Sequence, residues 1–313
     1  MKTFKRALLS AFAASVLAVA ITPAQAQDTA AMFGEIAVDK VSDSLYSLRR
    51  GAYRAPFYVT DEGVVVFDPM DPRAANYLRI EIGKVTTKPV KYVVYTTSLR
   101  DRVSGARIFK NEGAQIISQE KCAENMRETP FQDALPPDLT YKDKHEIKLG
   151  GKQVDLHYFG PANDTCQSVV VFKDEKVLFL SNVVVPPGPA VPWNSGMANI
   201  YMHNLIPFLK KVEDLAAVEG ITQNMGAFIS VDVTPERKLK ILPPVGPIAA
   251  VRQQREFWEA FYADVKAEMA KGATAATISD RLDYSKYKYL RRYNEDALKV
   301  VAKRVLSYYT TGR

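Results

Sequence analysis

The chain has 313 residues, of which 47% are hydrophobic and 25% charged, and its formal net charge is +7. This length suits one large domain with an appendage and a substantial hydrophobic core. Because the charge excess is small, there is little reason to expect a polyanionic partner, and we expect no nucleic-acid binding.

The first 26 residues have the pattern of a cleaved export signal. Three basic residues precede an apolar run from Ala7 to Ile21, and the segment ends in Ala24-Gln25-Ala26. This combination is typical of a signal peptide, whereas a membrane span needs about 20 apolar residues. We expect cleavage after Ala26, which leaves 287 residues with a net charge of +4. The mature protein is then expected in the periplasm, with no stable membrane insertion.

Segments of strand character follow, with helical segments between them. Runs rich in β-branched and aromatic residues predict strands, and apolar residues that return every three to four positions predict helices. The expected strands are 45–48, 57–59, 64–67, 92–95, 115–118, 154–158, 168–172 and 177–181, and the expected helices are 72–84, 103–111 and 202–218. This order of strands and helices predicts an α/β fold.

The pattern becomes helical after Pro247. Helical periodicity covers 249–271 and 287–308, with Gly272 and Gly312 at or just past the ends. We therefore expect a domain over 27–248 and a C-terminal helical extension over 249–313. Tyrosines alternate with basic residues near the start of the second helix. In an exported protein we interpret them as packing on the main domain or on a second subunit, which leaves a homodimer open.

Cys122 and Cys166 are the two cysteines of the chain. In an oxidising compartment such a pair forms either a disulfide or two buried thiols, and the sequence does not decide between these states.

Five sequence blocks follow one another between about Val41 and Arg255. They are Val64-Val65-Val66-Phe67-Asp68, a strand leading into Thr97-Ser98-Leu99-Arg100-Asp101-Arg102, Gly160-Pro161-Ala162-Asn163-Asp164-Thr165, Val177-Leu178-Phe179-Leu180-Ser181-Asn182, and Leu242-Pro243-Pro244-Val245-Gly246-Pro247. In order and form they resemble the metallo-β-lactamase superfamily, whose second block reads Thr-His-x-His-x-Asp-His. The resemblance implies an αββα sandwich, with the helical extension behind its last block.

The resemblance also shows which metal ligands this chain lacks. Carried over, the ligand positions fall on Thr97, Leu99, Asp101, Arg102, Asn163, Asn182 and Val245. Asp101 alone is retained, whereas zinc needs three or four imidazole, thiolate or carboxylate donors. None of the three histidines occupies a ligand position. We therefore expect no metal, no other cofactor and no zinc-dependent hydrolysis.

The former metal pocket supplies the candidate site residues, which are Thr97, Ser98, Leu99, Asp101, Arg102, Asn163, Asp164, Asn182, Trp193 and Val245. Two interpretations of Arg102 stay open. It either pairs with Asp101 and fills the pocket, or it presents its guanidinium, together with Arg100, to an anionic ligand. Trp193 and Tyr58 are candidates for an apolar wall.

Three functions follow from these features. The leading hypothesis is an exported, non-catalytic protein on a hydrolase scaffold, a pseudoenzyme that binds a small molecule or serves as an accessory protein. The alternative is a metal-independent hydrolase, lyase or isomerase that acts in the same cleft on a small anionic or aromatic substrate. Thr97, Ser98 or Cys166 is then the nucleophile, although no base is evident near them. A third is a partner-binding role of the C-terminal helices.

Overall fold

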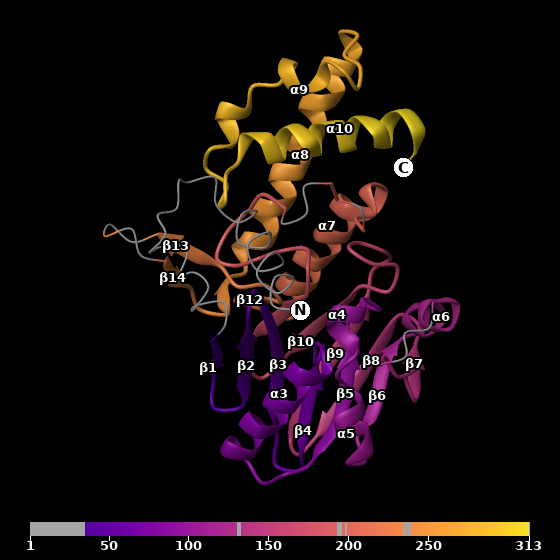
Figure 1. Cartoon of the computed structure of the whole chain (residues 1–313), viewed down its shortest axis with the longest axis vertical. Helices are drawn as coiled ribbons and strands as arrows, with labels where there is room; N and C mark the ends of the chain where they lie inside the picture. The colour runs from indigo at the N-terminus through magenta and orange to yellow at the C-terminus, as the bar shows by residue number, and fades with distance from the viewer. Residues whose placement is uncertain are drawn as a thin grey trace, which may run out of the picture.

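Two β-sheets face each other and helices cover both outer faces (Figure 1). The computed structural model describes residues 35–129, 133–192, 196–197, 199–233, 236 and 239–312. The expected signal peptide over residues 1–26 and the candidate Trp193 lie outside the described residues. Among the residues described, no helix combines the length and the apolar composition needed to cross a membrane.

The first sheet comes from the N-terminal half of the chain. Its strands, adjacent in chain order, are β1 (Ile36–Lys40), β2 (Leu45–Arg50), β3 (Tyr53–Val59), β4 (Val64–Phe67), β5 (Val90–Tyr95), β6 (Gln115–Gln119) and β7 (Leu139–Tyr141). Pairing is antiparallel as far as β4 and parallel from β4 to β7. The connecting helices are α3 (Pro72–Val85), α4 (Arg100–Val103), α5 (Arg107–Asn111) and α6 (Glu120–Glu128).

The second sheet has the order β15-β12-β11-β10-β9-β8. Its strands are β8 (Lys144–Leu149), β9 (Lys152–Tyr158), β10 (Ser168–Phe172), β11 (Val177–Leu180), β12 (Gln223–Gly226) and β15 (Val245–Pro247). The helix α7 (Met202–Val218) joins β11 to its parallel neighbour β12. A small hairpin, β13 (Val231–Val233) and β14 (Leu239–Ile241), precedes β15.

Four segments complete the chain, namely α8 (Ala249–Ala270), α9 (Ile278–Arg281), the 3-10 turn η1 (Tyr284–Tyr287) and α10 (Glu295–Thr311). They form the C-terminal helical extension, which lies beyond one end of the sandwich (Figure 1). The helix expected over 287–308 begins only at Glu295, because the Asn294 side chain accepts a hydrogen bond from the Ala297 backbone N–H and caps α10 there.

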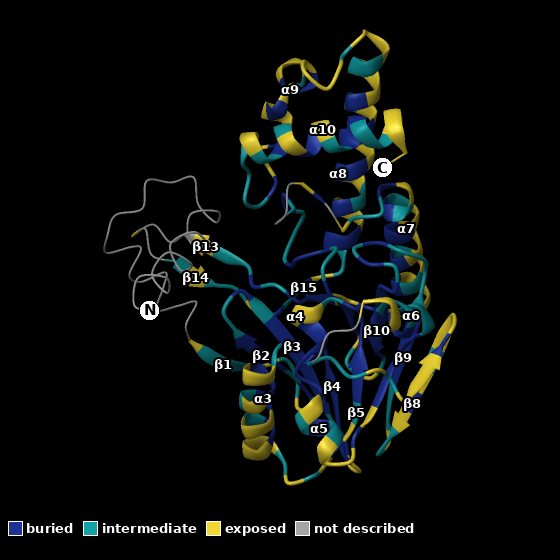
Figure 2. Ribbon diagram, turned by 45° about the vertical axis from the view of Figure 1, so that its right-hand side comes forward, coloured by how far each residue is buried: buried dark blue, intermediate teal, exposed yellow. Residues whose placement is uncertain are grey.

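Three apolar clusters fill the spaces between the layers. One lies between the sheets and contains Tyr58, Phe67 and Phe172, whose rings contact one another. A second lies between the first sheet and the helices α3 and α5, and a third joins the second sheet to α7, α8 and α10. Figure 2 shows this burial through the centre and the exposed outer face of α3. Because α8 and α10 share the third cluster, the extension is packed into the domain core.

The helix expected over 103–111 is two helices, because the chain turns at Gly105. A Cβ atom at Gly105 would lie 2.7 Å from both the Ala75 Cβ and the Pro69 carbonyl oxygen. Glycine therefore allows the close approach of this turn to α3. The strands β1, β7, β8, β12, β13, β14 and β15 were not among those expected.

Cys122 and Cys166 form a disulfide. Cys122 lies in α6 and Cys166 in the loop between β9 and β10, so the bond ties α6 to the segment that contains Asn163 and Asp164.

Removing this disulfide is expected to destabilise the fold. In the chain-entropy model, opening a loop that spans 44 residues lowers the free energy of unfolding by about 4 kcal/mol. Urea denaturation of a Cys122→Ser, Cys166→Ser double variant measures this loss. The wild-type chain under a reductant is the matched control and should unfold with the variant. Equal stability of oxidised wild type and double variant would contradict the prediction.

Candidate functional site

The candidate site lies where strand ends of the two sheets meet the C-terminal helices. β5 and the parallel pair β11 and β12 end at the same edge, so the segments that follow them converge. There a cavity of about 230 Å³ is enclosed by α4, α8 and the loops after β9, β11 and β12. Figure 1 shows α8 above this end of the sandwich.

The cavity wall is mostly apolar, with a few polar groups that converge on the interior. The apolar residues are Leu99, Val183, Val185, Ala190, Pro192, Met197, Ile200, Leu205, Phe228 and Trp258. The polar ones are Asp101, Arg102, Asn163, Asn182, Asn199, Gln254 and Arg292. This composition is typical of pockets for small organic molecules.

Arg102 is the central polar residue of the wall and is almost fully buried. Its guanidinium carbon lies 4.4 Å from the centre of the Tyr53 ring and 4.8 Å from that of Phe228. Nη2 donates to Asn182 Oδ1 over 2.9 Å, and Nη1 donates to the Ala227 carbonyl oxygen over 3.4 Å. Burial lowers the pKa of Arg102, and the charge of Asp101 opposes this shift.

Asp101 lies beside Arg102 but does not neutralise it by a close contact. Its Oδ2 is 3.9 Å from Arg102 Nε, which is ion-pair distance but too long for a hydrogen bond, and its side chain is half exposed. Arg102 Nε is buried and has no hydrogen-bond partner among the described residues.

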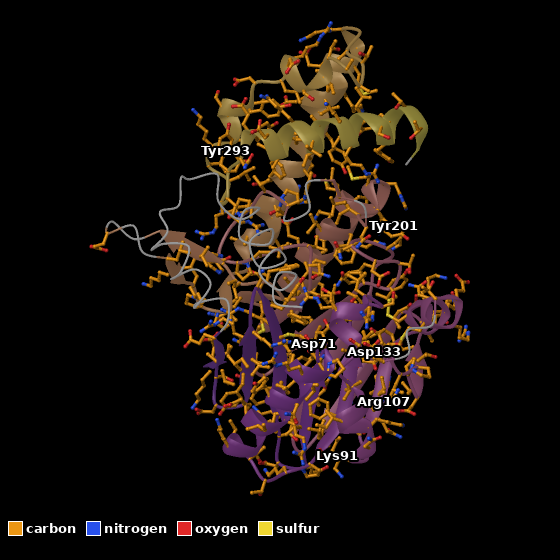
Figure 3. All side chains as sticks on the ribbon, viewed as in Figure 1. Asp71, Lys91, Arg107, Asp133, Tyr201 and Tyr293 are labelled. Carbon is orange, nitrogen blue, oxygen red and sulfur yellow. A yellow bond between two sulfur atoms is a disulfide. The ribbon has the colours of Figure 1, made fainter. Side chains whose placement is uncertain are left out.

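Arg100 points away from the cavity. It forms two hydrogen bonds with the Asp133 carboxylate, which lies on the surface (Figure 3). The interpretation in which Arg100 and Arg102 act together on a ligand is therefore wrong for Arg100.

Ser98 and Asp164 form a support beside the cavity. Asp164 Oδ2 accepts hydrogen bonds from the Ser98 backbone N–H and hydroxyl over 2.6 and 2.7 Å, and Oδ1 accepts one from the Thr165 N–H. The α6 residue Asn125 donates to Ser98 and Thr165 as well. Thr97 is fully buried, and its hydroxyl oxygen accepts from the Leu99 N–H over 3.4 Å. These bonds hold the loops that present Leu99 and Asn163.

Val245 and Tyr58 lie away from the cavity. Val245 belongs to β15, pairs with Met225 and packs against the core between the sheets. Tyr58 is buried in the same core, and its hydroxyl donates to the Asp174 and Glu175 carboxylates. The expectation that Tyr58 walls the pocket is therefore wrong. β12 is the parallel neighbour of β11, and the segment after it contributes Phe228 to the cavity wall, as the segment after β11 contributes Asn182.

Several residues of the cavity wall were not among those expected from the sequence, including Phe228, Gln254, Trp258 and Arg292, and neither was Tyr53, which packs against Arg102. Tyr53 begins a strand, and three of the others belong to the C-terminal extension. The helical periodicity of α8 predicts that one face is buried, but it does not show what that face contacts. No local sequence signal therefore identified these residues.

The donor atoms present do not fit the metal ions of this fold. Of the positions carried over from the metallo-β-lactamase ligands, Leu99 and Val245 have no donor atom and Arg102 places a cation in the wall. Among the described residues, no three His, Cys, Asp or Glu side chains stand together as a metal site.

Asp68 is a fully buried carboxylate that directly follows β4. Its Oδ1 and Oδ2 accept hydrogen bonds from the backbone N–H and the hydroxyl of Thr96. Burial raises the pKa of Asp68 to about 6, and the hydrogen bonds from Thr96 and the charge of Arg102 limit the rise. Two residues later, the Met70 N–H donates to the Arg102 carbonyl oxygen, so this turn supports the backbone of α4.

Comparison with solved structures identifies the architecture. The metallo-β-lactamase from Pontibacter korlensis superposes with a TM-score of 0.60 and 17% identity, over 72% of this chain and 99% of that one. The metallo-β-lactamase IND-7 superposes with a TM-score of 0.58 and 18% identity, over 72% of this chain and 98% of that one. DIM-1 metallo-β-lactamase exposed to ceftazidime superposes with a TM-score of 0.58 and 13% identity, over 72% of this chain and 97% of that one. The chain therefore has the metallo-β-lactamase fold, as the sequence blocks predicted, with a C-terminal helical extension.

One curated protein is similar in sequence. The 2,4-dinitroanisole O-demethylase subunit alpha of Nocardioides sp. (strain JS1661) is 25% identical over 169 residues, which cover 51% of this chain and 52% of that protein. The chain thus spans about half the length of this relative. No protein-family model matches the chain.

Replacing Asp68 by Asn is expected to flatten the pH dependence of stability. Because the pKa of Asp68 in the folded chain is above its unfolded value of 3.8, its contribution to stability is greatest at low pH and is lost as the pH rises through about 6. The loss amounts to about 3 kcal/mol. Urea denaturation between pH 4 and 8 should show wild type losing this stability relative to Asp68→Asn.

The control is Asp214→Asn, which removes the same charge from an exposed position on α7. This variant should follow the wild-type pH profile. Parallel profiles for wild type and Asp68→Asn would show that Asp68 does not titrate in this range.

Proposed function

We propose that this protein is a non-catalytic binding protein whose cavity takes a small organic anion with an apolar, preferably aromatic, body. The observation that carries the proposal is the incomplete hydrogen bonding of the buried Arg102. A guanidinium has more N–H donors than the two that bond to Asn182 and Ala227, and its Nε has no hydrogen-bond partner. An anion at the cavity edge of Arg102 would complete this set and offset the cost of burying the charge.

Two aromatic rings pack beside the Arg102 guanidinium. The ring centres of Tyr53 and Phe228 lie 4.4 and 4.8 Å from the guanidinium carbon and 5.3 Å from each other, so both rings pack on one side of the guanidinium and stabilise its positive charge. Carboxylate oxygens match the N–H groups of a guanidinium in geometry and charge.

Arg292 adds a second cation to the wall. Its Nη2 donates to the Val191 carbonyl oxygen, and burial lowers the pKa of Arg292 to about 9, with a further decrease caused by Arg291. Asp101 is the carboxylate among the lining residues, so the wall carries more positive than negative charge. Trp258 and Phe228 supply the apolar surface for a ligand body.

Binding of benzoate tests this proposal. Arg102→Met keeps the length and apolar contact of the side chain but removes its donors, so the dissociation constant for benzoate should rise at least about tenfold. Isothermal titration in the presence of a chelator measures it. The control Arg100→Met removes the same charge from the same helix and should bind like wild type. Benzamide, the neutral analogue, should bind weakly to all three proteins. Equal affinity of benzoate for wild type and Arg102→Met would contradict the proposal.

A second candidate is a metal-independent enzyme acting on an aromatic compound in the same cavity, and the similarity to a 2,4-dinitroanisole O-demethylase subunit favours it. Hydrolysis of 2,4-dinitroanisole by water yields methanol and 2,4-dinitrophenolate, which absorbs visible light. An increase in that absorbance that persists with chelator and disappears in Asp101→Asn would support the enzyme. If the rate stays at the blank level while 2,4-dinitrophenolate binds, the binding protein is favoured.

Two further features stay predictions from the sequence. Export to the periplasm after cleavage behind Ala26 is tested by N-terminal sequencing of the secreted chain. A homodimer, or an accessory role beside another subunit, is tested by the mass of the purified protein in solution.

A further inference from the structure

A second cavity of about 450 Å³ lies next to the first. The two cavities share four wall residues, Leu99, Asn163, Asn199 and Ile200. The far wall of the second cavity comes from the last turns of α10, which contribute Arg304, Tyr308 and Gly312. Tyr201 and His203 line it at the start of α7, where the C-terminal helices meet the sandwich (Figure 3).

Arg304 is a cation in the wall of this second cavity. Its side chain is partly buried, and Nη1 is buried without a hydrogen-bond partner. Within the described part of the chain, no carboxylate lies within ion-pair distance of Arg304, whereas Lys299 on the same helix pairs with Glu295. A buried donor on a cation is costly unless an acceptor reaches it.

The negative groups nearby are already engaged. Asp164 lines the second cavity, but its oxygens accept hydrogen bonds from Ser98 and Thr165. In the last turns of α10, the Leu306 and Ser307 carbonyl oxygens accept hydrogen bonds from the hydroxyls of Thr310 and Thr311. Asp164 therefore has its acceptors satisfied, whereas Arg304 keeps a buried donor without an acceptor among the described residues.

We infer that the second cavity binds a second acidic group of the ligand, which makes the ligand an elongated dicarboxylic acid with an apolar middle. This inference rests on the proposed function, since the first acidic group and part of the body occupy the first cavity. Leu99 and Ile200, in the shared wall, contact the middle of such a ligand, and Tyr201 and Tyr308 flank the acidic group at Arg304. The C-terminal extension thus determines ligand length.

A series of aromatic dicarboxylates of increasing length, each paired with its monocarboxylate, tests the inference. The series runs from terephthalate to biphenyl-4,4′-dicarboxylate and terphenyl-4,4″-dicarboxylate, with benzoate and the corresponding aryl carboxylates as partners. For one length, wild type should bind the diacid about tenfold more tightly than the monoacid, as expected for one charge-assisted hydrogen-bonded contact. Arg304→Gln should abolish that difference and leave monoacid affinity unchanged.

Two variants control this experiment. Lys303→Gln removes the same charge from an exposed neighbouring position on α10 and should keep the preference for the diacid. Arg304→Lys keeps the charge and should retain most of the preference. Circular dichroism and thermal unfolding of each variant show whether the fold is intact.

The outcomes separate this inference from the proposed function. If benzoate binds through Arg102 and no diacid exceeds its monoacid, or if Arg304→Gln weakens both equally, the second acidic subsite is overturned and the proposed function stands. If no benzoate binds but a diacid binds with dependence on Arg304, the second subsite is supported and the role of Arg102 is overturned. Absence of binding across the series overturns both.

Discussion

The guanidinium of Arg102 joins the two halves of this fold at the point where strand ends converge. The side chain extends from α4 beside the first sheet. It donates hydrogen bonds to Asn182 and Ala227, which follow β11 and β12 of the second sheet in the chain. Tyr53 of the first sheet and Phe228, which follows β12 of the second, both pack against it. Through these contacts one buried side chain connects the two sheets.

The surrounding electrostatics follow from that cation. Arg102 limits the rise in the pKa of the buried Asp68, and Asp101 in turn opposes the lowering of the pKa of Arg102. Burial and then the charge of Asp101 raise the pKa of Tyr53. The site therefore keeps a fixed positive charge in an apolar environment, an arrangement suited to anion recognition.

The sequence predicted the sandwich and the position of the cavity, but it did not predict the part of the cavity wall that comes from the C-terminal extension. The resemblance to metallo-β-lactamases placed Leu99, Asp101, Arg102, Asn163 and Asn182 together at ligand positions, and these five line the cavity, whereas Thr97 and Val245 of the same set do not. The block around Val245 resembles a ligand loop but forms an outer strand. The strand β12 was missed because Gln223-Asn224-Met225-Gly226 contains no β-branched residue. Trp258, Arg292 and Arg304 come from helices whose contacts depend on tertiary packing, which local periodicity does not encode.

The most direct test of the central claim, that Arg102 is the anion-binding centre of a metal-free site, is a crystal structure of the protein with 4-bromobenzoate. The account predicts anomalous bromine density between Phe228 and Trp258, with the carboxylate hydrogen-bonded to Arg102. A metal ion between the strand ends, or bromine density only outside the cavity, would contradict it.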